Sequence, residues 1–218
     1  MTHPWWPLFD LRVTNGPLTL RAMTEADLAK LAASLPDDLE QNPAAARYPN
    51  LDNRVNRGVV VHQEYWSAWG NWSVDAWRLP FVTIHDGTVI GSQTLEGTDF
   101  VRLRVVDTAS YLVPEARGRG YGKAMRRAVL ALAFGELGAE MAITSAWHDN
   151  HASLGVSRAL GYESNGISMH VHDDRVDRME HLRLMRSDWL ASGQANGIEI
   201  DGFDACRPLF GLAESPVQ

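Results

Sequence analysis

The stretch from Tyr111 to Phe134, YLVPEARGRGYGKAMRRAVLALAF, is the feature that most restricts how this chain can fold. Its first residues favour a strand, three glycines follow at alternate positions, and the remainder has the pattern of an apolar helix. Glycines between a strand and a helix commonly place an anion at the helix N-terminus, because the first backbone N–H groups are unpaired there and the helix dipole is positive. The stretch therefore predicts an α/β fold with an anion-binding loop.

Three kinds of phosphate-binding loop are compatible with glycines at this position. A Walker loop is excluded, because Ala124 follows the lysine and Arg117 occupies the position of the first glycine. A dinucleotide-binding fingerprint fits poorly, because the glycines alternate and residues 141–147 contain no acidic side chain. The pattern [Q/R]-x-x-G-x-[G/A] fits Arg117–Gly122 at every position. A glycine-rich turn without a ligand is the alternative on this hexapeptide alone.

The physics of such a loop identifies the residues that would hold the anion. Successive backbone N–H groups point into one concavity, and glycines let the backbone approach a phosphate closely. Arginine and lysine side chains in the same segment add positive charge. The predicted anion-binding residues are Arg117, Gly118, Arg119, Gly120, Tyr121, Gly122 and Lys123.

Hydrophobic periodicity along the chain predicts a mixed α/β sheet with helices on both faces. Thr24, followed by Asp27, is typical of a capping box, and Asp86-Gly87 between apolar runs is typical of a hairpin turn. The predicted strands are 18–21, 81–84, 89–95, 105–113, 141–147, 167–172 and 180–186. One predicted helix begins at Thr24, and three others span 62–77, 121–137 and 151–160. Residues 36–53 are predicted to be loop, and those from Ser187 onward to pack on the domain as irregular structure.

Composition excludes several classes of protein. The formal net charge of −7 argues against a general nucleic-acid-binding surface, which would be basic. We expect no membrane span and no signal peptide, because no apolar run reaches about 18 residues and no basic segment precedes an apolar one at the N-terminus. The single cysteine, Cys206, excludes an intrachain disulfide and fits a cytoplasmic location. Nothing in the sequence specifies an oligomeric state, and a homodimer is the working expectation.

A second motif downstream of the glycines gives the chain a family resemblance. Asn150–Ser153 has the form N-x-x-S, and Leu160-Gly161-Tyr162 has the form L-G-[FY]. Together with the loop, these residues resemble the GNAT superfamily of CoA-dependent N-acyltransferases, over about residues 18–186. The N-x-x-S form, with Ser157 where many relatives carry a tyrosine, looks most like the RimJ/RimL-type branch.

The resemblance also suggests a subgroup and a division of the chain. The segments WPLFDLRV, RGYGKAMRRAVLALAF and DGFDACRPLFG look like an actinobacterial subgroup whose members are labelled as possible succinyltransferases. We expect an N-terminal extension at 1–17, the GNAT domain at 18–187 and a C-terminal tail at 188–218. The implied fold is a twisted, mostly antiparallel mixed sheet with helices on both faces.

The resemblance implies that the anion is the pyrophosphate of acetyl-CoA or succinyl-CoA, the acyl donor. The strand at Tyr111–Val113 would splay from its neighbour, and an amide near Leu112 or Val113 would face the thioester oxygen. Asn150 would bind the pantetheine arm, although a helix N-cap is an equally good interpretation. Ser153 would contact the sulfur or protonate the thiolate, or else act as an ordinary polar residue of the first helical turn.

The implied reaction is acyl transfer to a primary amine by direct attack in a ternary complex, because no activated nucleophile is evident. The candidates for the catalytic base, besides Ser153 as an acid, are His148, His172 and Asp107, with His170 beside them. The acceptor is a small amine or a protein N-terminus. A succinyl donor would need a cationic or hydrogen-bonding partner such as Arg102, Arg104 or His172. We expect no metal, because the histidines lack the spacing of a known site. The alternative function is a catalytically silent CoA-binding sensor or partner protein of the same fold.

Overall fold

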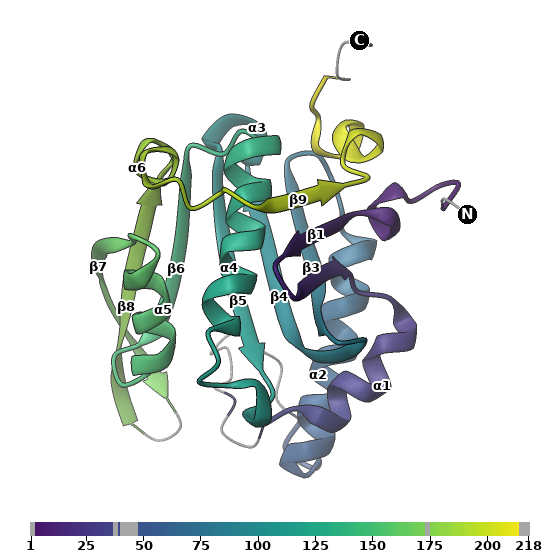
Figure 1. Cartoon of the computed structure of the whole chain (residues 1–218). Helices are drawn as coiled ribbons and strands as arrows, with labels where there is room; N and C mark the ends of the chain where they lie inside the picture. The colour runs from purple at the N-terminus through teal and green to yellow at the C-terminus, as the bar shows by residue number, and fades with distance from the viewer. Residues whose placement is uncertain (1–2, 37–38, 40–47, 173–174, 214–218) are drawn as a thin grey trace.

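The structure is a computed structural model, which describes residues 3–36, 39, 48–172 and 175–213, with the side chain of His172 also outside this part. Its centre is a nine-stranded mixed sheet in the order β7-β8-β6-β5-β4-β3-β2-β1-β9. All neighbouring strands described are antiparallel except β5 and β6. The predicted fold class, a mostly antiparallel mixed α/β sheet, is confirmed (Figure 1).

Two groups of elements build this architecture. The strands are β1 (Arg12–Asn15), β2 (Leu18–Ala22), β3 (Ala76–His85), β4 (Thr88–Thr98), β5 (Val105–Leu112), β6 (Met141–Trp147), β7 (Glu163–His172), β8 (Arg175–Met185) and β9 (Ile198–Asp201). The α-helices are α1 (Glu25–Ser34), α2 (Asn53–Gly70), α3 (Phe100–Leu103), α4 (Tyr121–Ala131), α5 (His151–Ala159) and α6 (Arg186–Ser192). Short 3-10 segments are η1 (Pro7–Asp10), η2 (Pro114–Ala116) and η4 (Asp204–Phe210), and a π-helical turn, η3 (Leu132–Glu136), ends α4.

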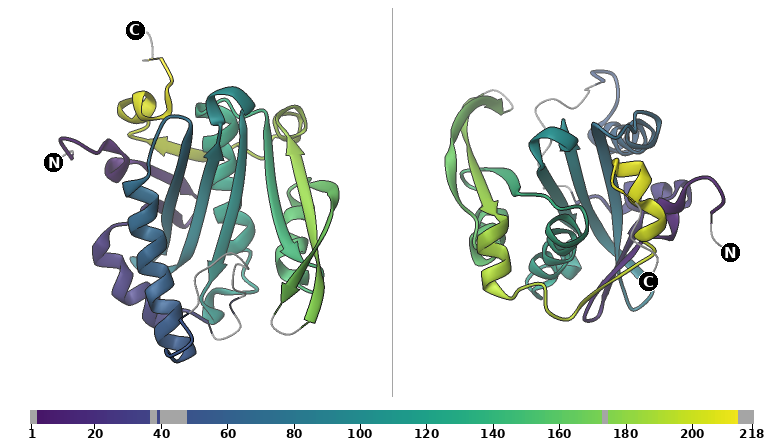
Figure 2. Two further views of the ribbon diagram at one scale, coloured as in Figure 1. Left: turned by 180° about the vertical axis from the view of Figure 1, so that it is seen from behind. Right: turned by 90° about the horizontal axis from the view of Figure 1, so that it is seen from above.

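The helices lie in two layers. Helices α4 and α5 cover one face of the sheet, and α1 and α2 cover the other (Figure 2). The main core lies under α4, where Met125, Val129 and Phe134 are almost completely buried. No helix in the described ranges is long and apolar enough to cross a membrane.

Helix α2 differs most from its prediction, because it spans Asn53–Gly70 and not 62–77. The carboxylate of Asp52 accepts a hydrogen bond from the amide of Val55 at 3.0 Å and caps the helix start. The helix ends at Gly70, and Trp77, the predicted last residue, belongs to β3. Trp72, in the connection between the two elements, stacks on Trp77 with ring centroids 5.9 Å apart.

The segment after Ser187 is more regular than predicted. It contains most of α6, then β9 and η4, and β9 pairs with β1 as the edge of the sheet. The indole Nε1 of Trp72 donates to the carbonyl of Leu209 at 2.9 Å, which joins the tail to the end of α2. The prediction of irregular structure was wrong, because the alternation in Ile198–Asp201 is short and its partner strand was not identified.

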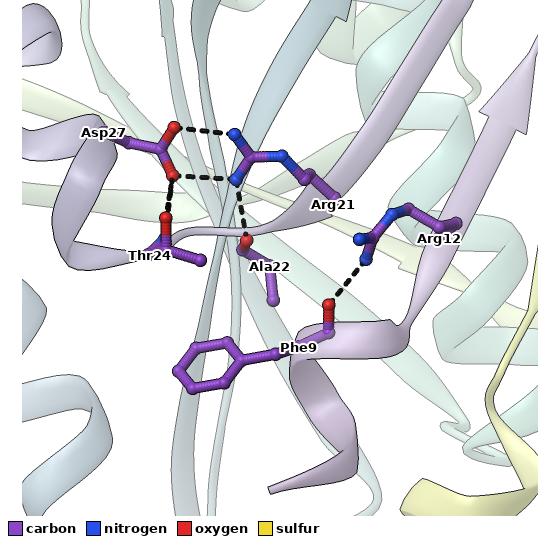
Figure 3. A network of polar contacts seen from close by, with 6 residues as sticks. All are labelled: Phe9, Arg12, Arg21, Ala22, Thr24 and Asp27. Atoms are coloured by element: carbon purple, nitrogen blue, oxygen red, sulfur yellow. Dashed lines mark hydrogen bonds and ion pairs between the residues drawn. The ribbon is translucent and has the colours of Figure 1, made fainter. Parts of the chain in front are cut away.

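The predicted capping box at Thr24 is confirmed and is part of a larger ion pair (Figure 3). The carboxylate of Asp27 accepts from both the amide and the hydroxyl of Thr24 at 2.8 Å. Both carboxylate oxygens also lie 2.7 Å from the guanidinium nitrogens of Arg21. This arrangement fixes the start of α1 against β2.

Candidate active site

The sheet opens between β5 and β6. These parallel strands pair only at Val105–Asp107 with Met141–Ile143, although β5 continues to Leu112 and β6 to Trp147. Beyond Asp107 the two strands diverge, as Figure 1 shows. We call the opening the gap. One side of the β5 backbone in the gap has no partner strand, so its polar groups are available to a ligand.

Backbone direction shows which groups of β5 face the gap. The amide of Val113 donates to the carbonyl of Ile90 at 2.9 Å, on the β4 side. Amides alternate in direction along a strand, so the amide of Leu112 points into the gap. The carbonyl of Thr108 also faces β6, since it accepts from the hydroxyl of Thr144 at 3.0 Å. Of the two amides predicted to face a thioester oxygen, the geometry therefore leaves Leu112.

The glycine loop lies at the mouth of the gap, directly before α4. Gly118 and Gly120 have φ of 73° and 79°, in the left-handed region that favours glycine, and Gly120 precedes the first residue of α4. Arg119 and Lys123 are exposed. The hydroxyl of Tyr121 lies 2.8 Å from Nε2 of His85, so this residue offers its amide to an anion and not its side chain.

The start of α5 forms the other side of the mouth. The side-chain oxygen of Asn150 accepts from the amide of Ser153 at 2.9 Å, which is the N-cap arrangement. Its side-chain NH2 group remains a donor for a ligand. Ser157 is buried and donates to the carbonyl of Ser153 at 3.1 Å, so its hydroxyl is used within the helix. Both interpretations of Asn150 are compatible with this geometry.

A buried arginine lies beneath the gap on the α4 face. Arg126 is only 3% exposed, and its guanidinium lies 3.1 Å from the hydroxyl of Ser110 on β5 and 3.5 Å from that of Thr144 on β6. Its Nε has no hydrogen-bond partner among the described residues, and no carboxylate there lies within ion-pair distance of it. A buried cation that has no carboxylate in direct contact is costly, so this one is suited to meet an anion in the gap.

Two carboxylates face each other on the opposite, α2-facing side of the sheet. Asp107 on β5 is the register partner of Glu96 on β4. Burial raises the pKa of Asp107, the negative charge of Glu96 raises it further, and the amide of Thr108 and the charge of Arg126 oppose the rise, leaving the pKa at about 6. Asp107 accepts from the Thr108 amide at 2.6 Å, at the last residue of β5 that pairs with β6. Its carboxyl group is therefore a proton acceptor at the closed end of the gap.

A cavity of about 320 Å³ lies on this side of the sheet, between α1, α2 and strands β3 to β5. Arg78 extends from β3 into its wall and forms ion pairs with Glu64 on α2 and, at 2.8 Å, with Glu96. Tyr111 also lines it; burial raises the pKa of this phenol, and its hydroxyl has no partner among the described residues. The cavity thus adjoins the carboxylate pair at one end.

Other predicted residues lie elsewhere. His148 follows β6, and its Nδ1 is 2.9 Å from the carboxylate of Asp177 on β8, across the gap from β5. The side chain of His172 lies outside the described part. Arg102 and Arg104 adjoin the paired start of β5, and Arg104 donates to the carbonyl of Leu137 at 3.4 Å. Neither arginine is brought to the gap.

Sequence reasoning missed Glu96, Arg78, Glu64 and Arg126. Glu96 and Arg78 stand within strands beside apolar residues, and Arg126 follows Met125 on the buried side of α4, so each of these three is a charge in an apolar pattern. Glu64 is exposed on α2 and has no such signal. This signal marks a residue as unusual. It does not show which charges meet, because that depends on strand register.

Comparisons with known proteins agree with this geometry. The sequence model described as the acetyltransferase (GNAT) domain matches residues 17–163. The solved structure of Mycobacterium smegmatis RimJ in complex with CoA-disulfide has a TM-score of 0.68 and 16% identity, covering 89% of this chain and 98% of that one.

Two further structures share the fold. A Vibrio cholerae spermidine N-acetyltransferase SpeG chimera has a TM-score of 0.62 and 16% identity, covering 80% and 99% of the two chains. A probable acetyltransferase has a TM-score of 0.63 and 18% identity, covering 80% and 96%. At these identities the likeness concerns the fold alone. The domain match, which spans more than half of the chain, shows that this protein belongs to the GNAT family of N-acetyltransferase enzymes.

Proposed function

We propose that this enzyme transfers an acyl group from acyl-CoA to a primary amine by direct attack within a ternary complex. The observation that carries the proposal is the gap between β5 and β6. The glycine loop and the start of α4 lie at the mouth of the gap, and the Asp107–Glu96 pair lies at its closed end. A donor and an acceptor reaching the gap from opposite faces of the sheet would meet within it.

The chain's own groups support donor binding in three places. The amides of the loop and of the first turn of α4, with Arg117, Arg119 and Lys123, fit a pyrophosphate. The amide of Leu112 is directed at the thioester oxygen, where it would stabilise negative charge that develops during attack. The side-chain NH2 of Asn150 and the hydroxyl of Ser153 lie at the α5 side, for the pantetheine arm and the departing thiolate.

Asp107 is our choice for the catalytic base. It lies where the strands part, about 16 Å of extended strand from Leu112, so a chain of water molecules would carry the proton to it. Its pKa of about 6 leaves it mostly ionised at neutral pH and makes it a stronger base than an ordinary carboxylate. His148 is a weaker choice, because its imidazole is paired with Asp177 beyond β6. Glu96 lies beside Asp107 and is paired with Arg78 at 2.8 Å, and its carboxylate would favour the approach of a cationic acceptor.

The acyl group is acetyl or succinyl, and one observation favours succinyl as a second donor. The β5 residues on the α4-facing side follow one another from the mouth of the gap to its closed end in the order Leu112, Ser110 and Thr108. The hydroxyl of Ser110 contacts the guanidinium of Arg126. An acyl chain that extends inward from a thioester at Leu112 would direct a terminal carboxylate toward this buried cation.

The test is thiol release from acetyl-CoA and succinyl-CoA in the presence of a panel of primary amines. Amine-dependent release at rates above hydrolysis is expected, and its absence with every pair would contradict the proposal. Arg126→Met is expected to reduce kcat/KM for succinyl-CoA by 10-fold or more, relative to that for acetyl-CoA. Arg127→Met is the matched control, because that neighbouring arginine donates to the carbonyl of Gln194 away from the gap. An equal effect of Arg126→Met on both donors would show that Arg126 does not bind a succinyl carboxylate.

A further inference from the structure

We infer that His148, held in place by Asp177, carries a proton from the attacking nitrogen to the departing thiolate. This inference rests on the proposed function, since it completes the proton transfers at the same site. An acceptor that enters as an ammonium group loses two protons when it becomes an amide, and the thiolate gains one. Asp107 accepts the first proton before attack. The second leaves after the C–N bond has formed, and a group close to the sulfur is needed to transfer it.

His148 lies at the level of the reacting thioester. Strands β5 and β6 pair in parallel at Val105–Asp107 with Met141–Ile143. The same register, continued along both strands, sets Leu112 and His148 at one level on opposite sides of the gap. The amide of Leu112 faces the thioester oxygen in the proposed complex. His148 is therefore level with the reacting carbon, whereas Asp107 lies about 16 Å of extended strand away.

Two contacts with β8 fix the position of His148. Its backbone amide donates to the carbonyl of Arg178 at 3.0 Å, and its Nδ1 lies 2.9 Å from Oδ1 of Asp177. Atoms this close share a proton, so Nδ1 carries the hydrogen and Nε2 remains for a ligand. Nδ1 is buried while 39% of the side chain is exposed, so the exposed part of the ring lies away from Asp177. We therefore assign the proton transfer to Nε2.

Asp177 is itself held at both carboxylate oxygens. Its Oδ1 accepts from the amide of Arg178 at 2.7 Å, and its Oδ2 lies 2.9 Å from the guanidinium of Arg175. The residue is only 8% exposed. These contacts keep the carboxylate beside the imidazole, and its negative charge faces the imidazolium that forms while His148 holds the transferred proton. Asp177 is thus a positioning residue for His148.

The serine hydroxyls near the start of α5 are less suited to this transfer. Ser157 is buried and donates to the carbonyl of Ser153 within the helix. The hydroxyl of Ser153 would contact the sulfur, but an alcohol does not take up and release a proton near neutral pH as an imidazole does. Ser153 would therefore orient the sulfur, and His148 would carry the proton.

The transfer balances in atoms and electrons. The nitrogen lone pair forms the C–N bond, and the negative charge on the thioester oxygen faces the amide of Leu112. Nε2 of His148 takes a proton from the positively charged nitrogen. As the C–S bond breaks, its electron pair leaves on sulfur, which receives this proton from the imidazolium. His148 returns to its initial state, and only the proton on Asp107 passes to solvent.

The kinetic test uses acetyl-CoA, or succinyl-CoA where it reacts faster, with the best acceptor among butylamine, 2-phenylethylamine and spermidine. His148→Gln is expected to lower kcat about 10²-fold and to change KM for the donor by less than about threefold. Asp177→Asn is expected to lower kcat about 10-fold, and the double variant should be no slower than His148→Gln, because the two residues act as a unit. A kcat of His148→Gln within about threefold of the wild type would overturn the inference.

Two controls separate proton transfer from a structural role. His62→Gln changes a histidine whose Nδ1 lies 2.8 Å from the carbonyl of Gly58 within α2, and its kcat is expected to equal that of the wild type. Imidazole added to His148→Gly is expected to restore kcat at least 10-fold, and substituted imidazoles should restore it to a degree that depends on their basicity. Rescue that is absent, or that is independent of basicity, would assign His148 a structural role.

A binding measurement needs no turnover and therefore separates the inference from the proposed function. Calorimetric titration gives the affinities for CoA and for desulfo-CoA, which lacks the sulfur. The wild type is expected to bind CoA about fivefold more tightly, and His148→Gln is expected to lose most of this difference. Equal affinities in the wild type, or the full difference in His148→Gln, would overturn the inference. Absence of thiol release by the wild type with every amine would instead overturn the proposed function.

Discussion

Glu96 and Asp107 are register partners on the antiparallel strands β4 and β5, with both side chains on the α2-facing side of the sheet. Side chains in such a pair lie about 5 Å apart between Cβ atoms, so two ionised carboxylates there repel each other. The two carboxyl groups differ in their partners, because Glu96 forms an ion pair with Arg78 and Asp107 does not. Burial, and then the negative charge of Glu96, raise the pKa of Asp107 to about 6, which leads to the first two predictions.

Activity is expected to depend on the ionisation of Asp107. As pH falls through about 6, kcat/KM should fall in proportion to the ionised fraction, because only the carboxylate accepts a proton. Asp107→Asn is expected to lower kcat by about 10²- to 10⁴-fold and to remove this limb of the pH profile. The measurement is kcat/KM between pH 5 and 8. A profile that keeps its acidic limb in the variant would assign the base to another residue, with His148→Asn as the next variant to measure.

The same substitution is expected to stabilise the fold at neutral pH. The pKa of Asp107 is raised from 3.8 to about 6, so the folded state binds the proton more tightly than the unfolded state. The free energy of unfolding of the wild type should therefore fall by about 3 kcal/mol as pH rises from below 4 to above 6. Asp107→Asn lacks this loss, so the variant should gain stability relative to the wild type at pH 8 but not at pH 4. Denaturant unfolding at the two pH values measures the difference, and an equal difference at both would contradict the raised pKa.

Gly120 tests the anion-binding loop. Gly120→Ala is expected to weaken CoA binding by 10-fold or more, because its φ of 79° is unfavourable for alanine and the added methyl group stands where a phosphate would approach. The loss of stability should be only about 1 kcal/mol. Gly138→Ala is the matched control, because Gly138 also has a positive φ, 66°, and open space around it, at the far end of the α4 segment. Calorimetric titration with CoA gives both affinities, and equal affinities would show that the loop does not hold the donor.

Asp27 provides a prediction about the fold. Burial raises its pKa, but the paired hydrogen bonds from Arg21 and those from Thr24 outweigh that effect, so the pKa of Asp27 is lowered. Asp27→Asn is expected to destabilise the protein at pH 7 by roughly 2 kcal/mol, less than a fully buried pair would give because Arg21 is partly exposed. The stabilisation is present above pH 3.8 and is lost as pH falls through the lower folded pKa. Glu163→Gln, which breaks the exposed pair with Arg183, is the control and should change stability by less than about 0.5 kcal/mol.

Local signals in the sequence determined much of this protein. The capping box at Thr24, the hairpin turn at Asp86-Gly87 and the loop Arg117–Gly122 all depend on residues close together in the chain, and the structure contains each of them. The glycine loop and the N-x-x-S motif, in this order, also sufficed to identify the family. Helix α4 and strand β6 lie between the two motifs, and α5 begins at the second, so the spacing of the motifs reflects these elements. Such features follow from backbone preferences that neighbouring residues set.

Tertiary structure decided everything that depends on distant residues. The end of α2 was misjudged because Trp77 pairs with Gly97 of β4 as part of β3, and β9 was missed because it is defined by pairing with β1. The site depends on the same kind of information. Strand register, which sets Asp107 opposite Glu96 and ends the pairing of β5 with β6 beside it, creates both the gap and the raised pKa. A short sequence window contains no record of which strand becomes its neighbour. The sequence could therefore place the glycine loop before a helix, but it could name Asp107 only as one of several candidate bases.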